Sequence, residues 1–139
     1  MTETIKRRGF LAAGVALMTS LAGCNQDPGG LGGDPKPSYD HTLEINNNVN
    51  ESRTVKVEIT HVDSNELVYS DTHTAEGNSD VVVFDLEELK DSYSGIEDFE
   101  ISAETEDNSH STVYPTDSCH GAPEIRLYED SVRIMHAIC

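Results

Sequence analysis

Apolar and polar side chains alternate along the stretch Val55-Lys56-Val57-Glu58-Ile59-Thr60, and this stretch decides the fold. Successive side chains of a β-strand point to opposite faces, so a period of two predicts a strand with one buried face and one solvated face. The same alternation occurs over residues 43–45 and 99–103.

Shorter apolar or β-branched runs predict further strands at 67–69, 81–86, 112–114, 125–127 and 132–138. Polar turn residues separate them, at 46–50, 63–65, 76–79 and 129–131. Residues 86–91 have helical composition but suffice only for a single turn. About eight short strands with almost no helix predict an all-β fold over residues 41–139, an antiparallel β-sandwich of immunoglobulin-like arrangement. The chain has no Trp, so the buried Trp of antibody-type domains is missing.

The segment before the first strand has a different composition. Residues 25–40 contain four glycines and three prolines, which do not build a packed element. We therefore expect residues 24–40 to be a flexible Gly/Pro tether with a reach of about 20 Å.

The N-terminus carries two motifs of protein export. Lys6-Arg7-Arg8-Gly9-Phe10-Leu11 resembles a twin-arginine export signal, with Arg7 and Arg8 as the paired arginines. The apolar run that follows ends at Leu21, short of the roughly 20 residues needed to span a bilayer. Leu21-Ala22-Gly23-Cys24 resembles a lipobox, which implies that residues 1–23 are removed and that Cys24 carries the lipid. The alternative is a plain secretion signal with a chance cysteine.

The charge of the chain is strongly negative. Residues 1–23 hold one acidic and three basic residues, so their removal takes the formal net charge from −17 to −19. Such a charge repels nucleic-acid phosphates, and basic residues for docking on anionic lipid are scarce. We therefore expect no nucleic-acid partner and attachment to the membrane through the lipid alone. An acidic surface of this kind is typical of proteins that work in high salt.

Together, the signal, the acidity and the terminal cysteines resemble the small twin-arginine-exported lipoproteins of haloarchaea. This resemblance implies a lipid-anchored protein on the extracellular face of the cell membrane. No catalytic motif of a known family is carried over.

Two cysteines, Cys119 and Cys139, remain after lipidation of Cys24. An exported chain with two cysteines usually pairs them, so we expect a disulfide that pins the chain end. The alternative is a reactive or metal-binding thiol pair.

The residue types of a blue-copper site occur near the C-terminus. Cys119, His120, Met135 and His136 supply one thiolate, two imidazoles and a thioether. In a cupredoxin the Cys, the second His and the Met lie on one tight loop, whereas here Cys119 and Met135 are far apart. A disulfide would also consume the thiolate, so we expect no copper and no other cofactor.

Other candidate sites are weaker. The acidic clusters Asp85, Glu87, Glu88, Asp91 and Glu104, Glu106, Asp107 lack the spacing of a Ca²⁺-binding EF-hand and indicate a solvated face. No nucleophile elbow, zinc-protease motif or phosphate-binding loop is present. Asn50-Glu51-Ser52 is the one glycosylation sequon.

These observations predict a membrane-anchored cell-surface lipoprotein with a non-enzymatic β-sandwich that binds or scaffolds an envelope protein or a glycan. The alternative is a small cupredoxin-like redox or metal carrier.

Overall fold

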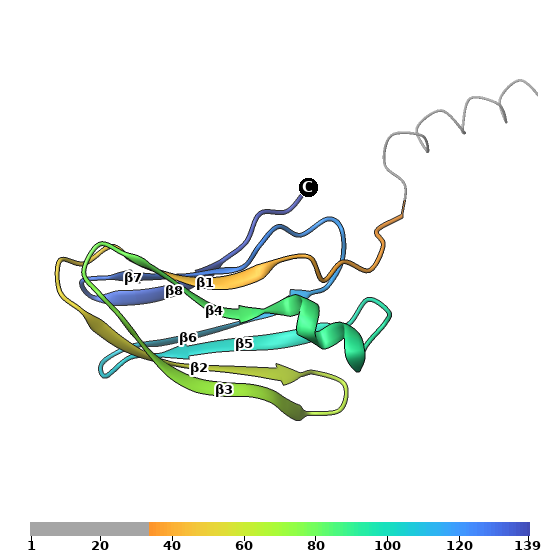
Figure 1. Ribbon diagram of the computed structural model, residues 1–139, viewed down its shortest axis with the longest axis horizontal. Helices are drawn as coiled ribbons and strands as arrows, with labels where there is room; N and C mark the ends of the chain where they lie inside the picture. Colours follow the sequence, from red (N-terminus) through yellow and green to blue (C-terminus); the bar gives the residue numbers. More distant parts are fainter. Residues whose placement is uncertain (1–33) are drawn as a thin grey trace, which may run out of the picture. The chain divides into compact units, whose positions relative to one another are not determined.

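The computed structural model describes residues 34–139, which form eight β-strands and a short 3-10 helix (Figure 1). The strands make two layers of four, in the order β4-β1-β7-β8 and β3-β2-β5-β6. Their bounds are β1 Thr42–Asn47, β2 Arg53–His61, β3 Glu66–Ala75, β4 Asp80–Asp85, β5 Asp98–Glu104, β6 Ser109–Pro115, β7 Glu124–Tyr128 and β8 Ser131–Met135. The all-β prediction with about eight strands in a sandwich is confirmed.

The pairing is antiparallel at every neighbour except one. β1 and β7 run parallel, with Ile45 opposite Ile125. The predicted antiparallel sandwich is therefore confirmed apart from this one pair, which makes its sheet mixed. Parallel neighbouring strands need a long connection. Here the connection from β1 to β7 contains all the elements from β2 to β6. The hairpins β2-β3, β5-β6 and β7-β8 stay within a sheet, and the other connections cross between the sheets as in Greek-key sandwiches.

The core lies between the two layers and consists of the alternating apolar residues. Val55, Val57 and Ile59 of β2 are completely buried, whereas Lys56 between them is exposed. The inward side chains of the neighbouring strands join them in a single cluster, which includes Leu43, Ile45, Phe99, Ile101, Tyr114, Ile125, Leu127, Val132 and Ile134. Full burial of each large apolar side chain contributes about 1.5–3 kcal/mol, so this pattern is the main source of stability.

The predicted helical turn is the 3-10 helix η2, Leu86–Asp91, which links β4 to β5. Asp85 caps it, because its side chain accepts a hydrogen bond from Glu87 N at 2.9 Å. Leu86 and Leu89 face inward and are buried.

One asparagine of the expected turn at 46–50 has a different role. Asn47 is the last residue of β1 and is only 2% exposed. Its Nδ2 donates to the carbonyls of Glu51, Ala75 and Glu76, and its Oδ1 accepts from Val49 N. This side chain therefore joins the β1-β2 connection to the end of β3.

The folded unit begins earlier than the predicted boundary at residue 41. Lys36 O accepts from Ser118 N at 2.8 Å, and Ser38 N donates to Thr116 O at 2.9 Å. Tyr39 is buried, and its hydroxyl donates to Gly95 O at 2.7 Å. The predicted tether therefore extends too far at its C-terminal end. The proline-rich composition of this segment predicted a tether. Proline is also compatible with a sheet edge, so the composition did not distinguish a tether from this edge contact.

Candidate functional site

A buried histidine at the end of β2 lies between a serine and a glutamate. His61 Nε2 is 2.7 Å from Glu97 Oε1, and His61 Nδ1 is 2.7 Å from Ser64 Oγ. The imidazole is 7% exposed and the Glu97 side chain 27% exposed. Ser64 N also donates toward Nδ1, at 3.3 Å, so Nδ1 is the acceptor and the Nε2 proton faces the carboxylate.

Local sequence explains why these groups meet. The β2-β3 turn ends at Asn65, which has a positive φ of 58°, a conformation that asparagine tolerates better than most residues. This turn brings Ser64 back over the imidazole. Glu97 directly precedes β5, the strand that pairs with β2, and Thr116 Oγ1 fixes its backbone by accepting from Glu97 N at 2.9 Å.

Two aromatic rings enclose the imidazole. The Tyr93 ring centroid lies 4.5 Å from that of His61, and the Phe99 centroid lies 5.3 Å away. Burial raises the pKa of the Tyr93 phenol, and the carboxylates of Glu66 and Glu97 raise it further. The surroundings of His61 are therefore apolar and anionic at once.

A second carboxylate completes this group. One donor atom each from His61, Asp63 and Glu97 lies within 4.8 Å of the other two. No other group of three such side chains converges in this way within residues 34–139. Sequence reasoning missed it, because Asp63 and Ser64 carried only a turn signal and Glu97 was one acid among many.

The C-terminal cysteines are bonded to each other. Cys119 and Cys139 form a disulfide with their Cα atoms 5.1 Å apart. Cys139 N also donates to Cys119 O at 2.9 Å, and Gly121 N donates to Ala137 O at 2.8 Å. The last residues therefore lie against the 119–121 segment, as the expected role in pinning the chain end requires.

The four residues considered for copper do not make a blue-copper site. The Cys119 sulfur is consumed by the disulfide, and Met135 is 43% exposed. The structure does bring the two imidazoles together, with ring centroids of His120 and His136 5.1 Å apart. His120 Nδ1 is held by Asp117 Oδ1 at 2.6 Å, and this hydrogen bond lowers the pKa of the Asp117 carboxyl.

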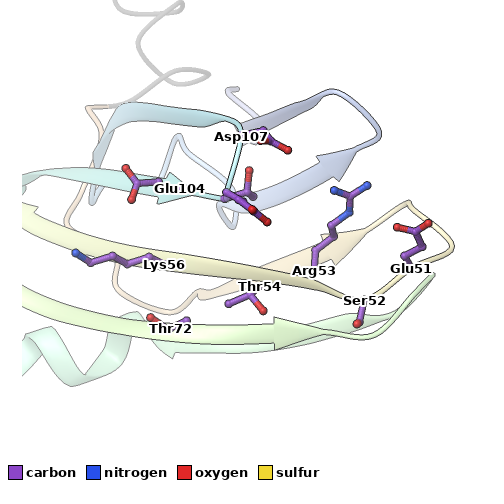
Figure 2. A pocket seen from close by; sticks show the side chains of 10 residues that line it. Glu51, Ser52, Arg53, Thr54, Lys56, Thr72, Glu104 and Asp107 are labelled. Carbon is purple, nitrogen blue, oxygen red and sulfur yellow. The ribbon is translucent and has the colours of Figure 1, made fainter.

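The acidic clusters have structural or surface roles. In the first cluster, Asp85 caps η2, and Glu87 lies 3.1 Å from Lys90 Nζ. The second cluster borders a hollow of about 610 Å³ at the end of the β3-β2-β5-β6 sheet where β2 begins and β5 ends (Figure 2).

Charged and hydroxyl side chains line this hollow, which we call the polar groove. Arg53 and Lys56 project from β2, with Glu104 on the neighbouring strand β5 and Thr72 on β3 (Figure 2). The full set is Glu51, Ser52, Arg53, Thr54, Lys56, Thr72, Glu104, Thr105, Glu106 and Asp107. The groove gathers two of the few basic residues of the chain and presents both hydrogen-bond donors and acceptors.

Asn50 of the sequon is exposed, and its Oδ1 accepts from Asn78 Nδ2 at 2.6 Å. Glycosylation at this position stays a prediction. Arg7, Arg8 and Cys24 lie outside the described residues. Among residues 34–139, no helix has the length and apolar character needed to cross a membrane.

Comparisons with protein-family models, with curated proteins and with solved structures found no significant match to this chain.

Proposed function

We propose that this chain is a lipid-anchored lipoprotein of the outer cell surface, whose β-sandwich is a non-enzymatic binding or scaffolding domain. The paired arginines Arg7 and Arg8 would direct export, and Cys24 would carry the lipid. The acidic composition suits a domain that stays hydrated in high salt, as in the haloarchaeal lipoproteins that the chain resembles.

The disulfide carries this proposal. The chain has three cysteines, and Cys119 and Cys139 are bonded to each other. Structural disulfides persist in oxidising compartments and are rare in the cytosol. The third cysteine, Cys24, then stands where a lipobox requires it. An exterior location and a lipid anchor account for all three cysteines.

The polar groove supports binding as the role of the domain. It is wide and open, and its lining consists of charged and hydroxyl side chains. Small-molecule sites are usually enclosed and mostly apolar, which this groove is not. We therefore propose an envelope protein or a glycan as the partner, held by hydrogen bonds and charge.

A cupredoxin-like carrier is not supported, because the thiolate that such a site needs is bonded in the disulfide.

The lipid anchor is tested by Cys24→Ser in cells grown at the working salt concentration. We expect the variant to appear in the medium, since no lipid holds it. The double variant Cys119→Ser/Cys139→Ser is the matched control and should stay in the membrane fraction. A Cys24→Ser protein that partitions into detergent as the wild type does would contradict the anchor.

The groove is tested by crosslinking and pull-down from intact membranes at high salt. Lys56→Glu reverses one of its two positive charges. Lys90→Glu, on η2 outside the groove, is the control, since the two lysines are similarly exposed at 51% and 47%. We expect Lys56→Glu alone to reduce capture of the partner. Equal capture by wild type and Lys56→Glu would exclude the groove as the binding surface.

A further inference from the structure

The end of the sandwich at the β2-β3 turn concentrates negative charge without a basic partner. Within the described part of the chain, neither Asp63 nor Glu97 forms an ion pair with a lysine or arginine. Glu66 adds a third carboxylate close enough to raise the Tyr93 pKa. A bound cation would offset the repulsion among these carboxylates.

The donor atoms are already close to the positions that one metal ion needs. Ligand bonds of about 2.0–2.2 Å place two ligands of one ion no more than about 4.4 Å apart. His61 Nε2 and Glu97 Oε1 are 2.7 Å apart, and the donors of all three side chains lie within 4.8 Å of one another. Asp63 is exposed, so rotation of its side chain closes the remaining gap without moving the core.

The surroundings of His61 are those of a metal-ligating histidine. Such a ligand usually hydrogen-bonds through its second ring nitrogen, which fixes the ring and its tautomer. In this structure Nδ1 accepts from Ser64 N at 3.3 Å; a metal at Nε2 would move the ring proton to Nδ1, which would then donate it to Ser64 Oγ at 2.7 Å. Tyr93 and Phe99 hold the ring from its sides and keep the local dielectric low.

We propose that His61, Asp63 and Glu97 bind a divalent transition-metal cation, with Ser64 as the residue that positions the imidazole. The imidazole favours Zn²⁺ and similar ions, whereas Mg²⁺ and Ca²⁺ prefer oxygen ligands alone. Three protein ligands leave at least one coordination position open to water or to a ligand from outside. The site uses none of the cysteines and does not depend on the lipid anchor.

The test is Zn²⁺ titration calorimetry of the purified, untagged full-length chain, in sodium sulfate because chloride complexes zinc. We expect one saturable site per chain that excess Mg²⁺ does not displace. Glu97→Gln and Asp63→Asn should each weaken binding at least tenfold. Ser64→Ala should weaken it by about 10–100-fold, as loss of an outer hydrogen bond to a ligand does.

Two control variants distinguish Zn²⁺ binding at this site from general attraction of Zn²⁺ to an acidic protein. Asp98→Asn removes the same charge next to Glu97, and His73→Gln removes an imidazole elsewhere, on β3. Both should bind Zn²⁺ within twofold of the wild type. The proposal is overturned if no saturable site is found, if Mg²⁺ displaces Zn²⁺, or if Asp98→Asn weakens binding as much as Asp63→Asn does. Asp63 is exposed, so its variant is informative even if Glu97→Gln folds poorly.

Discussion

Replacement of Asn47 by alanine should destabilise the domain more than its place in an asparagine-rich turn suggests. The side chain is buried and makes hydrogen bonds to four backbone groups, in Val49, Glu51, Ala75 and Glu76. Alanine can form none of these hydrogen bonds, so the four backbone groups lose their side-chain partner.

The magnitude follows from the burial of each bond. The bonds to Ala75 O and Val49 N are buried, and an orphaned buried group costs about 1–3 kcal/mol. The bonds to Glu51 O and Glu76 O are partly buried, so water can replace them at little cost. Folding of the alanine variant no longer requires the Asn47 side-chain amide to leave water. This gain offsets part of the lost unfolding free energy. We expect a loss of about 3 kcal/mol, a large share of the 5–15 kcal/mol typical of a domain.

The assay is urea unfolding at constant high salt, followed by circular dichroism. Asn48→Ala is the matched control, because Asn48 is exposed and only its backbone N–H is bonded, to Leu127 O at 3.1 Å. That control should lose less than about 0.5 kcal/mol, as surface substitutions usually do. Equal stability of the Asn47→Ala and Asn48→Ala variants would refute the argument from buried hydrogen bonds.

Three further predictions concern the cross-link, pH and salt. Cys119→Ser opens a link to Cys139 across 20 residues, so the unfolding free energy should fall by about 3 kcal/mol; an unchanged urea midpoint would contradict this. Burial and the neighbouring His120 lower the pKa of His136 below its ordinary 6.5, and the hydrogen bond from His120 lowers that of Asp117 below 3.8. Protonation therefore favours the unfolded chain in both cases, and stability should fall below pH 6.5 and again below pH 3.8. His136→Gln should remove the first step and Asp117→Asn the second, in melting curves taken across pH. The melting temperature should rise between 0.01 M and 1 M salt, because the Debye length shortens from about 30 Å to about 3 Å; a flat curve would count against a salt-adapted surface.

Some of the structure could be predicted from the sequence, because the deciding interactions are local. A period of two at Val55, Val57 and Ile59 can bury only one face of a strand, and all three side chains are buried. The predicted turns at 63–65, 76–79 and 129–131 begin just after the ends of β2, β3 and β7, and the 86–91 segment formed its single helical turn. The Cys119–Cys139 bond also agrees with the pairing expected from the number of cysteines and a predicted export signal, without knowledge of the topology.

The long-range pairings could not be predicted in this way. The local pattern of β1 is the same whichever strand lies beside it, so nothing in residues 42–47 indicated that β7 would pair with it in parallel. The burial of Asn47 and Tyr39 had no sequence signal either, because both depend on backbone groups supplied by distant segments.

The His61 group shows the same division between sequence and tertiary structure. The sequence by itself predicted a strand over residues 55–60 and a turn at 63–65, on either side of His61. Only the tertiary structure placed Glu97, 36 residues further along, at 2.7 Å from the imidazole. The physical reason is that side-chain periodicity specifies which face of a strand is buried. The pairing of β2 with β5 within one sheet then decides which distant groups meet at the end of that strand.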